Sequence, residues 1–166
     1  MSGTLPINGN VFVNGTLTAV GDITAANFPV PANAISQTNP SNRVPNSTSY
    51  FLMNGLGASI TPATSGNLAI TISGCFTTNT GNAVGLLYQI SYGTGAAPSP
   101  NTPLTGTQVG AIQEYSGQGF ASVPFSIQAA VPGLTKGTTY WVDLAARKVT
   151  SEVLTFSGLS VSIVEN

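Results

Sequence analysis

The ionisable side chains that could carry chemistry are scarce in this sequence. It contains no histidine, five acidic residues and four basic residues in 166 positions. Without histidine the chain can form no Ser-His-Asp triad and no Cys-His dyad, and most zinc sites are excluded as well. A pair of carboxylates, as in glycosidases, could still be assembled by the fold. The acidic residues are Asp22, Glu114, Asp143, Glu152 and Glu165.

The positions of these carboxylates argue against catalysis. Asp22 lies in an N-terminal repeat and Glu165 at the end of the sequence, and the other three fall on different expected strands. The Gly-rich stretch SYGTGAAPS lacks the lysine and the following helix of a phosphate-binding loop. We therefore expect a protein that is not an enzyme, with no catalytic residues, no cofactor and no metal.

The single tryptophan shares an expected strand face with two charged residues. Positions 141 to 147 read WVDLAAR, and because strand side chains alternate between faces, Trp141, Asp143 and Arg147 point to one side. Asp143 and Arg147 are about 13 Å apart along a strand, too far for an ion pair, so each is expected to face solvent or another subunit. Three roles stay open for Trp141: burial within or between subunits, a cover of loops, or contact with a ligand such as a glycan.

Composition and charge limit the possible partners. Charged residues make up 5% of the chain, against about 25% in a typical globular protein. The formal charge of −1 supplies no basic stripe for nucleic acid. No apolar run approaches the roughly 18 residues of a membrane helix, and the N-terminus lacks the pattern of a signal peptide. We expect no nucleic acid or membrane partner, and a surface of hydroxyls and amides suited to packing against other chains.

Residues 49–166 show the alternation of strands that have one buried face. No stretch has helical periodicity, and fainter strands are indicated at 50–53, 108–115 and 153–156. We therefore expect an all-β domain, a jelly-roll or Greek-key β-sandwich of about eight strands. The five clear strands are marked by Leu68, Ile70, Ile72 and Phe76; by Leu86, Tyr88, Ile90 and Tyr92; by Val123, Phe125, Ile127, Ala129 and Val131; by Tyr140, Val142, Leu144 and Ala146; and by Leu159, Val161 and Ile163.

One turn carries the spacing of a tyrosine corner. In LTKGTTY, Leu134 precedes Tyr140 by six positions across a Lys-Gly turn, so the phenol is expected to bond back to the turn before it. Because this motif occurs in immunoglobulin and fibronectin-like sandwiches, that topology stays open as the second choice of fold.

The first 28 residues contain a six-residue repeat, INGNVF, VNGTLT and AVGDIT. Glycine at the third place permits a tight turn, and the aliphatic fifth residue needs a surface to bury itself against. Three such units are too few to form a core. They would either wind with two other copies into a shared β structure or add strands to a partner. The expected anchor and oligomer-interface residues are Gly9, Val11, Gly15, Leu17, Gly21 and Ile23.

Residues 29–48 connect this repeat to the sandwich and contain four prolines among small polar residues. Proline favours extended conformations and lowers the entropy of the free chain. We therefore expect an extended linker or arm that can dock along a neighbouring surface.

Several stretches resemble proteins of tailed bacteriophages. ITISGCFTTNTG, YQISYGTGAAPSPNTPLTGTQVG and VPFSIQAAVPGLTKGTTYWVDLAA are similar to the C-terminal β-sandwich knobs of phage virion proteins, over about residues 67–166. NGNVFVNGTLTAVGDITA resembles repeats near the base of phage fibres and head spikes. The resemblance carries no active-site residues.

This resemblance implies a structural role in a virion. Such proteins are typically homotrimers whose jelly-roll domains pack around a threefold axis and whose N-terminal part is attached to the particle. Because this chain has only three hexads and an arm, a compact trimer at the capsid surface fits best. We expect a capsid decoration or cement protein that binds itself and the major capsid protein and is assembled in the host cytoplasm. The alternative is a short tail fibre or receptor-binding tip whose sandwich binds a host surface glycan.

Overall fold

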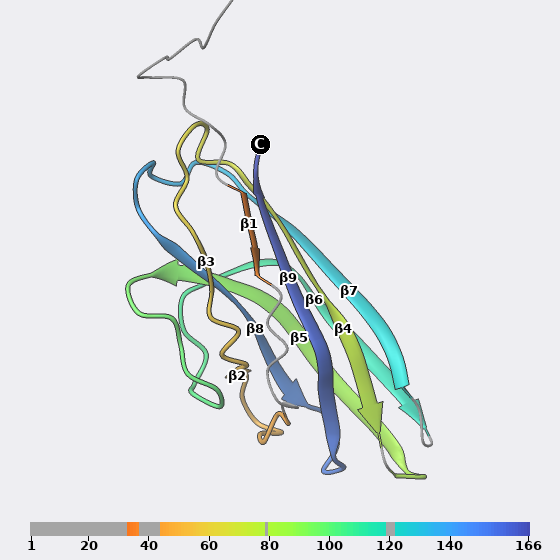
Figure 1. The fold of residues 1–166 in the computed structure, drawn as a ribbon. Helices are drawn as coiled ribbons and strands as arrows, with labels where there is room; N and C mark the ends of the chain where they lie inside the picture. The colour runs from red at the N-terminus through yellow and green to blue at the C-terminus, as the bar shows by residue number, and fades with distance from the viewer. Residues whose placement is uncertain (1–32, 37–43, 79, 119–121) are drawn as a thin grey trace, which may run out of the picture.

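The computed structural model describes residues 33–36, 44–78, 80–118 and 122–166. These residues form an all-β sandwich of two antiparallel sheets (Figure 1). Most of the arm lies outside the described residues, as do the expected anchor residues Gly9, Val11, Gly15, Leu17, Gly21 and Ile23.

The described residues contain nine strands. The first sheet has the order β1-β9-β4-β7, formed by β1 (Asn33–Ser36), β9 (Leu154–Glu165), β4 (Leu68–Thr78) and β7 (Ser122–Val131). The second sheet has the order β2-β8-β5-β6, with β3 also paired to β8, and is formed by β2 (Leu52–Met53), β3 (Ala58–Ile60), β8 (Tyr140–Lys148), β5 (Ala83–Thr94) and β6 (Thr107–Gln118).

The strand order is that of a jelly roll. Strands β2 and β3 pair with successive parts of β8, so they act as two pieces of one strand and the fold has eight strand positions. The chain changes sheet after β1, β3, β4, β6, β7 and β8 and forms a hairpin only between β5 and β6. An immunoglobulin-like sandwich instead pairs its first two strands. The expected all-β sandwich of about eight strands is confirmed, with jelly-roll rather than immunoglobulin-like connections.

The core lies between the sheets and is built from the alternating residues that the sequence marked. Phe76 lies at its centre, with its ring stacked on Phe125 at 4.3 Å between centroids and tilted against Tyr88 and Phe156. Burying four aromatic rings in one cluster contributes apolar area and favourable ring geometry together. This cluster packs β4 and β7 of the first sheet against β5 of the second.

The last strand contains a bulge that changes its alternation. Two separate strands were expected at 153–156 and 159–163, but β9 runs through both. Its register against β4 shifts between Ser73, paired with Ser160, and Cys75, paired with Ser157. Gly158, with φ 58°, is the extra residue, and one extra residue moves the following side chains to the other parity.

The tyrosine corner is present. The hydroxyl oxygen of Tyr140 accepts a hydrogen bond from the backbone N–H of Thr135 at 3.1 Å. The bond lies in the connection between β7 and β8, where the chain passes from one sheet to the other. The motif therefore stabilises a jelly-roll crossover here.

Part of the expected arm belongs to the sandwich. Strand β1 pairs with β9 from Asn33 opposite Val164 to Ser36 opposite Val161. Further along, the backbone N–H of Lys148 donates to the carbonyl of Ser47 at 2.8 Å. The start of β1 therefore lies beside the end of β9 and the C-terminus, at the upper end in Figure 1.

Candidate functional site

Strand β8 is buried on both of its faces. Val142 and Leu144 face the core as expected, but Trp141 and Asp143 on the other face are only 4% and 1% exposed. A cover formed by residues 51–56 and 99–106 lies over this face. The expectation that Asp143 faces solvent or another subunit is wrong, because this chain's own loops enclose its carboxylate.

The two segments of the cover are held together by backbone hydrogen bonds. The N–H of Met53 donates to the carbonyl of Thr102 at 2.9 Å, and the N–H of Asn101 donates to the carbonyl of Met53 at 2.8 Å. The N–H of Leu104 donates to the carbonyl of Phe51 at 3.2 Å. Segments about fifty positions apart in the chain therefore form one layer outside the second sheet.

Trp141 is the centre of a small second core under the cover. It packs with Met53 and Ala145, and the half-buried Phe51 and Leu104 close the cluster. Its indole N–H donates to the carbonyl of Thr94 at 3.1 Å, so the polar atom of the ring is satisfied. Of the three roles left open for Trp141, the structure shows the second, in which loops of the same chain cover the ring.

Glycine makes room for this tryptophan. A Cβ atom on Gly93 would lie 2.5 Å from the Trp141 ring, and one on Gly106 would also collide with it. Gly106 has a φ of 78°, which favours glycine independently. These two glycines flank the β5–β6 connection and let it pass over the ring.

The carboxylate of Asp143 fastens the cover to β8. Its Oδ2 accepts from the N–H of Gly55 at 2.8 Å, and its Oδ1 accepts from the N–H groups of Leu56 and Leu144 at 3.0 and 2.8 Å. Gly55 has a φ of 70°, so the turn that presents these donors depends on glycine. Asp143 is therefore placed to stabilise a turn.

Arg147 contacts a different part of the chain from Asp143. Its Nη1 donates to the carbonyl of Thr48 at 3.0 Å. The guanidinium carbon lies 5.7 Å from the centre of the Phe51 ring, within reach of a cation–π interaction. Of the three residues expected to share one face, Trp141 and Asp143 are buried under the cover, and Arg147 is half-buried at its margin.

A second buried carboxylate, which sequence reasoning placed only at the end of the chain, belongs to Glu165. It is 3% exposed. Four backbone N–H groups donate to it, those of Ala63, Thr64, Ser65 and Gly66, at 2.8, 2.8, 2.7 and 2.9 Å. Such a run of converging N–H groups is an anion-binding nest. The carboxylate of this chain fills it and closes the loop between β3 and β4.

Three of the large exposed apolar side chains gather at one end of the sandwich, which we call the distal end. They are Tyr50, which is 60% exposed, Val149 and Val153. The N–H of Tyr50 donates to the hydroxyl of Ser47, whose carbonyl accepts from Lys148. Because β9 starts here and pairs with β1 at its other end, the distal end lies opposite the point where residue 33 joins the sandwich.

Polar groups border this apolar cluster. The Nδ2 of Asn82 donates to the Oε1 of Glu152 at 2.7 Å, and Nζ of Lys148 donates to the carbonyl of Ser151 at 3.3 Å. With Arg147 nearby on β8, the distal end combines an exposed aromatic ring with charged side chains. Such a combination is common where proteins bind sugars or other proteins.

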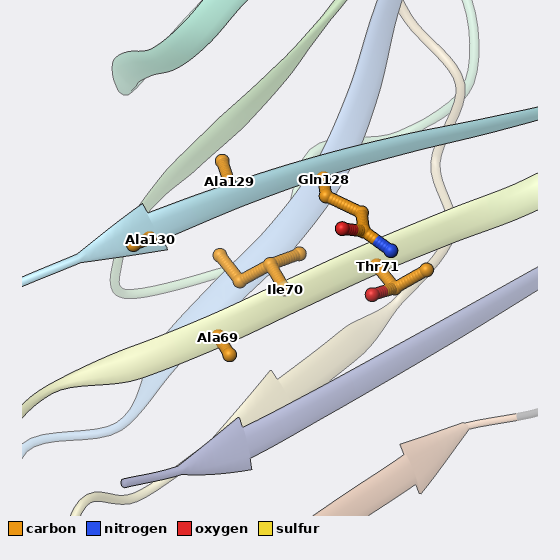
Figure 2. A pocket seen from close by; sticks show the side chains of 6 residues that line it. All are labelled: Ala69, Ile70, Thr71, Gln128, Ala129 and Ala130. Atoms are coloured by element: carbon orange, nitrogen blue, oxygen red, sulfur yellow. The ribbon is translucent and has the colours of Figure 1, made fainter.

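A shallow hollow of about 380 Å³ lies on the outer face of the first sheet. The paired residues Ile70 and Ala129, on β4 and β7, line it, and both side chains pack toward the core. The flanking outward side chains are those of Ala69, Thr71, Gln128 and Ala130 (Figure 2). Methyl groups, one hydroxyl and one amide line it, so it offers apolar contact with few hydrogen-bonding groups.

Two features are absent from the described ranges. No group of three His, Cys, Asp or Glu side chains among them is arranged to hold a metal ion. No helix among them is long and apolar enough to cross a membrane.

The strand order defines the class of this domain as a jelly-roll β-sandwich. No protein-family model matches the sequence, and no curated protein matches it either. Among solved structures, Eiger TNF from S. frugiperda is similar, with 7% identity and a TM-score of 0.41 over 83% of this chain and 93% of that one. The CBM22-1 xylan-binding domain of Xyn10C from Paenibacillus barcinonensis has 11% identity and a TM-score of 0.34, over 82% and 99% of the two chains. Neither similarity says what this chain binds.

Proposed function

We propose that this chain is a non-enzymatic virion structural protein, a homotrimeric capsid decoration or cement protein. In this role residues 1–28 and the arm bind the major capsid protein, and the jelly roll stands on the capsid surface. The observation that carries the proposal is the attachment of β1. Its pairing with β9 joins residues 33–36 to the edge of a sheet, so a load on the preceding residues is transmitted to the sandwich through backbone hydrogen bonds.

The arrangement of the ends supports the same role. The chain enters the sandwich beside Val164, and the distal end with Tyr50 lies at the opposite end of β9. An N-terminal segment bound to a particle would therefore leave the distal end pointing away from it. Three such anchors in a trimer act together, because the second and third bind at a high effective concentration once the first is bound.

The test is to place charges in the repeat of the full-length chain. Val11→Asp with Leu17→Asp puts two carboxylates at fifth positions of the hexads. The matched control, Asn10→Asp with Thr16→Asp, adds the same charge at fourth positions, where the third hexad already has Asp22. We expect the first variant to lose at least tenfold in co-sedimentation with capsids from which the protein has been stripped, and the control to bind as the wild type does. Equal binding of both variants would disprove the anchor.

The distal end favours a second candidate function, a short tail fibre or receptor-binding tip that binds a host surface glycan. Tyr50 is the exposed aromatic ring there, whereas Trp141 lies under the cover and could stack on a sugar only if the cover moved. A glycan array probed with the full-length protein separates the two functions. Specific binding that Tyr50→Ala abolishes would favour the tip, and the absence of binding would favour the cement protein.

A further inference from the structure

The outer face of the first sheet has no charged side chain on its three long strands. The outward residues of β4, β7 and β9 are Ser, Thr, Ala, Gln, Pro, Val and Cys. We call this surface the uncharged face. The exposed or half-exposed charged side chains of the described residues lie elsewhere: Glu114 on β6, Lys136 before β8, and Arg147, Lys148 and Glu152 toward the distal end.

A surface of this kind is inexpensive to bury. No charge has to be removed from water, which is the largest cost of closing a polar interface. Short side chains such as those of Ser, Thr and Ala also lose little rotamer entropy on contact. The hollow over Ile70 and Ala129 gives this otherwise flat face one place where an apolar side chain can enter.

The chain also carries an apolar side chain that projects from its edge. In the pairing of β5 with β6, Tyr88 lies opposite Gln113 but Ile90 lies opposite Val109. Strand β6 has two surplus residues there, and the bulge starts at Gly110, which has a φ of 75° and lies against Gln128 and Ala129 of β7. The bulge holds Ile112 54% exposed on an edge strand.

This bulge limits how the edge can be used. A bulged edge is a poor template for adding another strand, because its N–H and C=O groups no longer form a regular row. The feature that this edge offers for a contact is therefore the exposed Ile112 side chain. An isoleucine that protrudes from one surface and a hollow on another are complementary in kind.

We infer that the uncharged face is a subunit interface for a second copy of this chain, with Ile112 of one copy packed into the hollow of the next. The inference rests on the proposed homotrimer and names its contact surfaces. In the proposed contact each copy gives its Ile112 to one neighbour and its hollow to another. Such a contact is heterologous, and it closes into a ring when the rotation between copies permits.

The area of the face is consistent with this use. Three strands about 4.8 Å apart with roughly ten residues at 3.3 Å each cover about 14 by 33 Å, or roughly 460 Å². An opposing surface of equal area around Ile112 would bring the buried total to about 920 Å², a little under the roughly 1,000 Å² expected of a specific interface. In a ring every chain makes this contact twice, once through each surface.

The test uses charge on either side of the contact in the full-length protein. Ile112→Asp alters the protruding side chain and Ala130→Arg alters the rim of the hollow. The matched controls are Gln113→Asp, the next exposed residue of β6, and Ala97→Arg, an exposed loop alanine. Sedimentation equilibrium measures the trimer–monomer constant of each, and circular dichroism checks that each variant is folded.

We expect Ile112→Asp and Ala130→Arg each to weaken association at least a hundredfold, with both controls within threefold of the wild type. The double variant Ile112→Asp/Ala130→Arg places opposite charges across the contact and should recover at least tenfold. A wild-type trimer that both single variants leave intact would overturn the interface while the proposed cement function stands. A wild type that is monomeric throughout would instead overturn the homotrimer itself. Loss of capsid binding in the repeat variant, with the trimer intact, would show that anchor and interface are separate.

Discussion

Replacing Glu165 by glutamine tests whether the nest between β3 and β4 depends on a carboxylate. The Oε1 atom accepts from the N–H groups of Thr64, Ser65 and Gly66, and the Oε2 atom accepts from Ala63. Glutamine has nearly the same shape but only one oxygen. Its NH₂ group must therefore face at least one backbone N–H group that can only donate.

The magnitude follows from these contacts. Leaving one buried donor without an acceptor costs about 1–3 kcal/mol. The remaining three hydrogen bonds change from charged to neutral and weaken by about half, which adds roughly 2 kcal/mol. We therefore expect Glu165→Gln to lower the free energy of unfolding by about 3–5 kcal/mol, a large share of a stability that typically totals 5–15 kcal/mol. For a chain of this length the melting temperature should fall by about 6–20 °C.

Equilibrium urea unfolding at two protein concentrations tenfold apart measures this loss and separates it from any linked association. The matched control is Glu152→Gln, which removes the same charge from a half-buried carboxylate bonded to one side chain, Asn82. The control should cost less than about 1 kcal/mol. If Glu165→Gln cost no more than Glu152→Gln, the nest would not depend on the carboxylate and the reasoning would be refuted.

Three further changes test the cover and the core. Asp143→Asn should cost about 2–4 kcal/mol for the same reason as in the nest, and should shift the fluorescence of Trp141 to the red as the cover loosens; an unchanged spectrum and stability would contradict the role of its carboxylate. Gly93→Ala should destabilise by about 1–3 kcal/mol through collision with the tryptophan ring, measured by urea unfolding against Gly81→Ala, where a Cβ meets no atom within 4 Å. Burial raises the pKa of the Tyr88 phenol above its ordinary value of 10.0, so the native state holds this proton more tightly and stability should fall as pH rises through about 10. Tyr88→Phe should remove that part of the pH dependence, and an unchanged profile would exclude Tyr88 as its source.

The sheet core could be predicted because its signal is local. Alternation with period two marks the inward residues of β4, β5, β7 and β8, and the spacing of Leu134 and Tyr140 marks the corner. The bulge in β9 is also visible in the sequence, as a change in the alternation of apolar residues. Leu154 and Phe156 follow one parity and Leu159 follows the other, with Gly158 between them.

The cover and the nest could not be predicted because both depend on contacts between distant segments. Alternation identifies one buried face of β8 but says nothing about whether loops will close over the other. The two N–H groups of the cover that donate to Asp143 lie 87 and 88 positions away, at Leu56 and Gly55. Glu165 finds its donors 99 to 102 positions away. Two of the candidate catalytic acids, Asp143 and Glu165, therefore hold loops in place, a role that their own neighbours in the sequence do not indicate.

The burial of two acidic residues also affects how the chain can associate with other molecules. Two of the few carboxylates, Asp143 and Glu165, are enclosed by backbone donors and present almost no surface. The long strands of the first sheet then expose an area without charge, and the protruding Ile112 is apolar. Contacts between such surfaces gain little from electrostatic steering, so their association rate is modest and their affinity depends weakly on salt. The proposed interface therefore differs in physical character from the distal end, where Arg147 and Glu152 would make binding sensitive to ionic strength.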